Sequence, residues 1–167
     1  LPALLEQLKG SPRPTSLSWD LSSSTQQQLC DQLLIDWGRD KAITCVAASP
    51  HPFSITLGPR DFRITTRVVA GQPLSCFLAT AHEWGHSLYE QGLPTSSHQW
   101  FAWPLGQATS MAVHESQSLF WENRVARSQP FSELWWERFA AAGAPLTSSA
   151  DLWKAMNPMA PGCNRVE

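Results

Sequence analysis

The sequence from Ala81 to Gly92 reads AHEWGHSLYEQG and contains the pattern H-E-x-x-H. An α-helix turns about 100° per residue, so His82 and His86 would lie one turn apart along the helix and only about 40° apart around it. Two imidazoles at that separation can bind a single metal ion, and the pattern is typical of zinc hydrolases. Glu83 would lie toward the same side of the helix, where it can take a proton from a metal-bound water molecule.

The residues around this pattern predict one long, buried helix. The segment 71–73 opens the helix with a proline at its start, and Gly92 ends it. Leu78, His82 and His86 form one column at the edge of an apolar stripe, so both histidines should point toward the interior. The alternatives are two surface histidines on an ordinary helix, or two neutral core histidines, which would be costly to bury without partners. The apolar stripe consists of Leu74, Phe77, Leu78, Ala81, Gly85 and Leu88.

A second helix, predicted from about residue 105 to about residue 127, offers a third metal ligand. Glu115 falls in its apolar row, and a carboxylate in such a row needs a partner because a buried unpaired charge is destabilising. A metal ion held by His82 and His86 would be that partner. Two histidines and a glutamate are a ligand set of catalytic zinc sites, in which the fourth position is left for water. The other members of the row are Ala108, Met111, Ala112, Leu119 and Ala126.

Further helices are predicted at 22–37, 130–143 and 151–156, and two β-rich runs at 42–47 and 61–69. A turn signal at 57–59 lies between the two runs, so they could pair as a small antiparallel ribbon. Arg63, Thr65 and Arg67 would lie on one face of the second run, and Phe62 and Ile64 on the other. The arginine face is either solvated or a binding edge for a carboxylate.

The composition narrows the class of protein. The chain has 167 residues, the size of one domain, and a net charge of -2, which gives no electrostatic case for nucleic acid or acidic membranes. It contains no apolar run long enough to span a membrane. Its four cysteines are scattered without a C-x-x-C pair, so we expect reduced thiols in a cytoplasmic protein and no zinc site built from cysteine.

Four motifs follow one another in the order of a known family. They are H-P-F at 51–53, D-F-R-I-T at 61–65, H-E-W-G-H at 82–86 and H-E-S-Q at 114–117. Their order and spacing resemble the carboxypeptidase Taq family of metallocarboxypeptidases. The flanking stretches 88–92 and 121–123 are also similar to that family.

The resemblance implies a mainly α, gluzincin-like metallopeptidase fold, with a small antiparallel β-ribbon or sheet beside the active site. It also implies a homodimer in the full-length protein. The implied activity is hydrolysis of the C-terminal peptide bond of peptides or unfolded proteins, by attack of metal-bound water assisted by a glutamate. Specificity would be broad except for a C-terminal proline, and the metal would be Zn, with Co as the alternative.

The resemblance also implies a role for individual residues. The general base would be Glu83. The metal ligands would be His82, His86 and Glu115. Three further residues fall in the motifs and would bind substrate or support the site, namely His51, Arg63 and His114.

The chain departs from the family pattern toward its C-terminal end. Residues 157–167 are similar to the start of the family's I-R-x-x-A-D block, but Asn164 replaces the usual Ile and Gly162 a usual Ser. The family's long N-terminal helices and a later block with Gln, Asp, His and Trp are absent. We therefore expect residues 1–167 to form a single partial catalytic domain. The hypotheses are an active metallocarboxypeptidase, an inert fragment that binds metal or pairs with another chain, and a purely structural helical domain.

Overall fold

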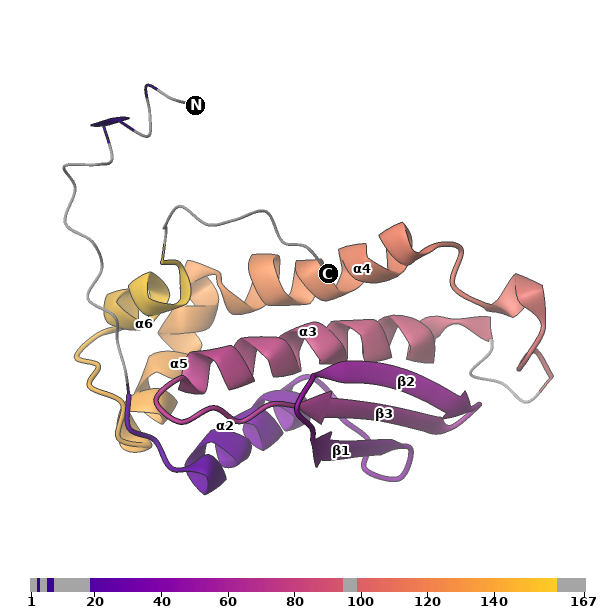
Figure 1. Ribbon diagram of the computed structural model, residues 1–167, viewed down its shortest axis with the longest axis horizontal. Helices are drawn as coiled ribbons and strands as arrows, with labels where there is room; N and C mark the ends of the chain where they lie inside the picture. The colour runs from indigo at the N-terminus through magenta and orange to yellow at the C-terminus, as the bar shows by residue number, and fades with distance from the viewer. Residues whose placement is uncertain (1–2, 4–5, 8–18, 95–98, 159–167) are drawn as a thin grey trace.

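The computed structural model describes residues 3, 6–7, 19–94 and 99–158 (Figure 1). The C-terminal motif at 157–167 lies outside the described residues except for its first two positions. The helical elements are α2 (Ser23–Asp36), α3 (Pro73–Gly92), the 3₁₀-helix η2 (Pro104–Gly106), α4 (Met111–Leu119), the π-helix η3 (Phe120–Ala126), α5 (Gln129–Ala141) and α6 (Ser149–Met156). The strands are β1 (Thr44–Ala48), β2 (Phe53–Gly58) and β3 (Asp61–Thr66).

The helix that carries the H-E-x-x-H pattern is the centre of the fold. In Figure 1, α3 runs between α4 on one side and the sheet on the other, and it contacts α2, α4, η3, β2 and β3. Its middle turns are buried on nearly every side, including the polar residues Glu83 and His86. A helix that is enclosed all round belongs to the core, and the predicted bounds of this helix are confirmed.

The sheet has the strand order β1-β3-β2, with β1 parallel to β3 and β2 antiparallel to β3. A small sheet beside the helices was predicted and is confirmed, but the antiparallel pairing of the runs 42–47 and 61–69 is wrong. The turn at 57–59 closes a hairpin between β2 and β3, so β1 reaches β3 from the other side and pairs in parallel. Phe62 and Ile64 are buried as expected.

Strand β2 was missed, although its sequence alternates apolar and polar residues. Its apolar side chains do not face the core: Phe53, Ile55 and Leu57 are 46%, 43% and 51% exposed. Alternation normally predicts that the apolar face of a strand is buried. Among the described residues, the apolar face of the edge strand β2 therefore remains exposed to solvent.

The larger hydrophobic cluster among the described residues joins α2, α3 and α5 at the N-terminal end of α3. The ring of Phe77 on α3 packs edge-on against Trp135 and Phe139 of α5, with centroids 5.1 Å and 4.9 Å apart. The predicted start of α2 is confirmed, because the Ser22 hydroxyl accepts a hydrogen bond from the backbone N–H of Thr25. Within the described residues, no helix combines the length and the apolar character needed to cross a membrane.

The predicted helix from 105 to 127 is wrong in its bounds and in its buried face. Its α-helical part begins at Met111, where the Ser110 hydroxyl caps the first turn, and it changes to π-helical winding at Phe120. Met111 is 74% exposed and Leu119 is 37% exposed, so the predicted apolar row does not face the core, except at its last member, Ala126, which is fully buried. The residues nearest to Gly85 of α3 are instead Gln117, Ser118 and Trp121, of which Ser118 is fully buried.

Gly85 sets the distance between α3 and α4. A Cβ atom added to Gly85 would lie 2.7 Å from Cα of Ser118 and 3.1 Å from Cδ1 of Trp121. Contacts this short against the backbone cannot be relieved by a side-chain rotation. The two helices can therefore pack at this distance only with a glycine at position 85.

We predict that Gly85→Ala lowers the free energy of unfolding by about 1–3 kcal/mol, the usual cost of overpacking a close contact. The measurement is urea unfolding of the two proteins, followed by circular dichroism. Gly92→Ala is the matched control on the same helix, because a Cβ atom at Gly92 meets nothing within 4 Å. Equal stability of Gly85→Ala and the wild type would show that α3 and α4 do not need this close approach.

Candidate metal centre

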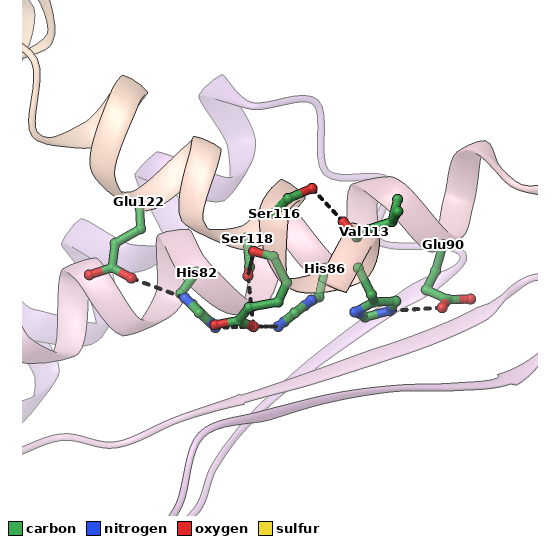
Figure 2. A network of polar contacts seen from close by, with 9 residues as sticks. His82, His86, Glu90, Val113, Ser116, Ser118 and Glu122 are labelled. Atoms are coloured by element: carbon green, nitrogen blue, oxygen red, sulfur yellow. Dashed lines mark hydrogen bonds and ion pairs between the residues drawn. The ribbon is translucent and has the colours of Figure 1, made fainter. Parts of the chain in front are cut away.

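His82, His86 and Glu115 converge from two helices. Nε2 of His86 lies 3.2 Å from Oε2 of Glu115, and Nε2 of His82 lies 3.6 Å from the same oxygen. One ligand atom from each residue lies within 4.8 Å of the other two. Figure 2 shows the imidazoles of His82 and His86 on α3, each with one ring nitrogen directed toward the same carboxylate oxygen, which is Oε2 of Glu115.

The two distances between a histidine and Glu115 fit one tetrahedral metal ion. Ligands that are each 2.0–2.2 Å from a tetrahedral zinc ion lie about 3.3–3.6 Å from one another. The two distances to Glu115 are 3.2 Å and 3.6 Å, which agree with this geometry to within about 0.1 Å. Two histidines and a carboxylate also leave one of four positions for water or substrate, as in catalytic zinc sites.

Ser118 holds the Glu115 carboxylate in place. Its hydroxyl lies 2.7 Å from the backbone carbonyl of Glu115, to which it donates, and 3.2 Å from Oε2 of the same residue. Ser118 is also the residue whose backbone packs against Gly85. The close helix contact and the position of the third ligand are therefore set by the same residue.

The two histidines differ in their surroundings. Burial lowers the pKa of His82, but the hydrogen bond to Glu122 and the nearby carboxylates outweigh it, so this pKa is raised. Burial, together with His114 and His82, lowers the pKa of His86 to about 4. His86 is therefore neutral at pH 7, the state in which an imidazole binds a metal.

Glu83 follows the first histidine and is only 8% exposed. Burial raises the pKa of its carboxyl to about 7 because the charged form loses its hydration. The charge of His82 opposes this rise, whereas Glu115 and Glu122 add to it. A carboxyl with a pKa near 7 can both accept and release a proton at neutral pH.

His114, predicted as a supporting residue, lies beside the metal group. Its ring stacks on that of His86 with centroids 4.4 Å apart, and its Nε2 lies 2.8 Å from Oε1 of Glu90. His114 and Glu90 also line a cavity of about 400 Å³. The remaining lining comes from β2 and from the segment between α3 and α4, at Ser54, Ile55, Thr56, Phe101, Ala102, Gln107 and Ala108.

His51 and Arg63, the other two predicted supporting residues, are not joined to the metal group by any contact among the described residues. Arg63 pairs with Asp61, with its Nε and Nη2 each 2.8 Å from a carboxylate oxygen. The Arg63 side chain is 51% exposed, on the face of β3 opposite to the buried Phe62. His51 is exposed, and its backbone carbonyl accepts a hydrogen bond from the Thr65 hydroxyl.

Two acidic residues of the site were missed in the sequence. Glu122 lies 3.0 Å from Nδ1 of His82, and Glu90 pairs with His114. Helical spacing alone could have indicated both. Glu122 is seven residues after Glu115, which is about 20° short of two full turns, and Glu90 is four residues after His86, in the same column.

Comparison with known proteins places these features in a family. The carboxypeptidase Taq (M32) metallopeptidase pattern matches residues 1–167. A thermostable carboxypeptidase 1 from Thermus thermophilus is 38% identical to this chain and is matched over 100% of this chain and 33% of its own length. Carboxypeptidase 1 from Bacillus subtilis is 35% identical over 70% of this chain and 23% of its own length.

Solved structures agree with the sequence comparisons. The M32 carboxypeptidase from Deinococcus radiodurans R1 has a TM-score of 0.82 and 31% identity, over 94% of this chain and 32% of that chain. Trypanosoma cruzi metallocarboxypeptidase 1 has a TM-score of 0.83 and 28% identity, over 96% of this chain and 32% of that one. The chain thus spans about a third of the length of these relatives. The resemblance and the mainly α fold class predicted from the sequence are confirmed, and the chain belongs to the carboxypeptidase Taq (M32) metallopeptidase family.

Proposed function

We propose that the protein is a metallocarboxypeptidase that uses one zinc ion held by His82, His86 and Glu115. The observation that carries this proposal is the convergence of the three donor atoms, in which both distances between a histidine and Glu115 suit a tetrahedral ion. Membership of a metallopeptidase family supports it. Cobalt has the same ligand preferences at such a site and is the alternative metal. Residues 1–167 would be part of the catalytic domain.

Each residue of the site has a role in the proposed hydrolysis. A zinc ion at this position supplies Lewis acidity, which polarises the scissile carbonyl and lowers the pKa of water toward 7. Glu83 accepts a proton from the attacking water and passes it to the nitrogen of the leaving amino acid. The buried position of Glu83 suits both transfers, since its carboxyl has a pKa of about 7.

The proposed substrates are the C-termini of peptides and unfolded proteins, with broad specificity except at a C-terminal proline. The cavity beside His114 adjoins the metal group and has room for a side chain. None of the described residues that line this cavity is an arginine or a lysine. The cation that would recognise a C-terminal carboxylate is therefore expected outside this lining.

The second candidate function is an inert fragment that keeps the metal site or pairs with another chain. It is favoured by the share of the relatives that this chain covers, which is 33% for the Thermus thermophilus protein. Metal binding needs only α3 and α4, whereas peptide hydrolysis also needs the surfaces that hold the substrate. One-to-one binding of zinc to the 167-residue chain without turnover would favour this second candidate.

We propose a cytoplasmic location for the protein. Among the described residues, Cys30, Cys45 and Cys76 are free thiols, and the sulfur atoms of Cys30 and Cys76 lie 3.5 Å apart without a bond. Cysteines without disulfide bonds are typical of cytoplasmic proteins. Cell fractionation followed by immunoblotting tests this location, and recovery from the medium or an oxidising compartment would contradict it.

We predict that Glu83→Gln lowers kcat for a blocked dipeptide by about 10²–10⁴-fold, the usual contribution of a general base. Zinc affinity should change little because Glu83 is not a proposed ligand. The measurement is steady-state kinetics of the protein at its natural length, with zinc content determined by atomic emission. Glu137→Gln, an exposed substitution on α5, is the control. More than a tenth of the wild-type kcat in Glu83→Gln would contradict the assigned role.

We also predict that a chelator abolishes peptide hydrolysis and that stoichiometric zinc restores it. Mass spectrometry of a digested peptide should show the loss of single residues from its C-terminus. Internal fragments would contradict the carboxypeptidase assignment and indicate an endopeptidase instead. Activity that survives complete removal of the metal would contradict metal dependence altogether.

A further inference from the structure

The ring nitrogen of His82 that faces away from the proposed metal has its own partner. Nδ1 of His82 lies 3.0 Å from Oε2 of Glu122, as Figure 2 shows. The two side chains are only 14% and 18% exposed. A carboxylate accepts but does not donate, so Nδ1 of His82 carries a proton, and in the neutral imidazole the lone pair of Nε2 is then free to bind a metal. Nε2 is the nitrogen that faces Oε2 of Glu115, where the proposed metal would bind.

The carboxylate of Glu122 is in turn fixed by Arg127. Nη2 of Arg127 donates to Oε1 of Glu122 at 3.0 Å, so each oxygen of the carboxylate has a separate partner. Arg127 also donates to the backbone carbonyl of Met156 at the end of α6. The backbone carbonyl of Arg127 accepts a hydrogen bond from the Asn157 side chain at 3.0 Å. Both the side chain and the backbone of Arg127 are therefore hydrogen-bonded to the end of α6 or the residue after it, and these contacts fix the guanidinium that binds Glu122.

The π-helical winding of η3 is what brings Arg127 to Glu122. In an α-helix, five residues turn through about 500°, which would place Arg127 about 140° away from Glu122 around the axis. In a π-helix the N–H of residue i+5 bonds to the carbonyl of residue i, so residues five apart are neighbours. The N–H of Arg127 donates to the carbonyl of Glu122 at 3.2 Å, in agreement with this winding.

We propose that Glu122 is a positioning residue for the metal site, which orients His82 and fixes its tautomer, and that Arg127 acts through Glu122. This proposal rests on the proposed function, because His82 needs orientation only if it binds a metal. Carboxylates that bond to a metal-binding histidine in this way typically contribute 10–100-fold to metal affinity. The Glu122–Arg127 pair is more than a surface ion pair, since both Glu122 oxygens are used and Glu122 is largely buried.

The test compares zinc affinity and the visible absorption spectrum of cobalt-substituted protein in the wild type and in Glu122→Gln, at the protein's natural length. Glutamine keeps the shape of glutamate, but its amide is a weaker acceptor. We expect the zinc Kd to rise about 10–100-fold and the cobalt bands to shift. The melting temperature of the metal-free protein is measured as well, because it reports the loss of the Glu122–Arg127 pair separately from the loss of metal affinity. Glu133→Gln, exposed on α5, is the matched control and should bind like the wild type.

An unchanged zinc Kd with an unchanged cobalt spectrum in Glu122→Gln would overturn the proposal. An equal loss in Glu133→Gln would also overturn it, since the effect would then come from general charge. If the wild type binds neither ion, the proposed metal site itself is wrong, and this outcome is distinct from the other two. Loss of affinity with a shifted cobalt spectrum in Glu122→Gln alone supports the positioning role.

A double-mutant comparison tests the part played by Arg127. If Arg127 acts through Glu122, Arg127→Gln should weaken zinc binding in the wild-type background and add nothing in the Glu122→Gln background. If the increases in zinc Kd of the two single variants multiply in the double variant, Arg127 does not act through Glu122. Its role would then be limited to the contact with Met156 at the end of α6.

Discussion

The close approach of α4 to α3 at Gly85 is the constraint on which the site depends. The backbone of Ser118 occupies the space that a side chain at position 85 would need. The same serine bonds to the carbonyl and the carboxylate of Glu115, which directs this third donor toward the two histidines of α3. A shift of α4 by the thickness of a methyl group would move Glu115 away from the point where the three donors meet.

The charges of the site show why a cation belongs there. Glu83, Glu115 and Glu122 gather around two histidines. Glu83 and Glu122 are largely shielded from water, whereas the Glu115 side chain is 38% exposed. Among the contacts of the described residues, the fixed positive charge that pairs with these carboxylates is Arg127, and it pairs with Glu122 alone. Burying like charges together is costly without compensation. A divalent ion between His82, His86 and Glu115 would provide that compensation.

The sequence predicted the parts of the fold that local chemistry decides. Helix α3 could be bounded because Pro73 and Gly92 mark its ends, and the offset of His82 from His86 follows from helix geometry. The prediction for Glu115 reached a residue that the structure does bring to the histidines, but from a premise that is wrong. Met111, Ala112 and Leu119, the members of the apolar row nearest to Glu115, are exposed. The position of Glu115 is set instead by the contact of Ser118 with Gly85.

The features that were missed depend on tertiary packing. The strand β2 turns its apolar residues outward, so alternation could not place it relative to the core. The parallel pairing of β1 with β3 follows only once β2 occupies the hairpin position. The π-helical turn after Leu119 leaves no clear signal in the sequence, and without it Arg127 would not meet Glu122.

The central claim is that two histidines and one glutamate, on two helices that meet at a glycine, hold a single metal ion. Its most direct test is anomalous diffraction at the zinc edge from crystals of the zinc-loaded protein. We expect one strong peak, about 2.0–2.2 Å from Nε2 of His82, Nε2 of His86 and a carboxylate oxygen of Glu115. No peak at this point, or a zinc ion bound by other residues, would contradict the account.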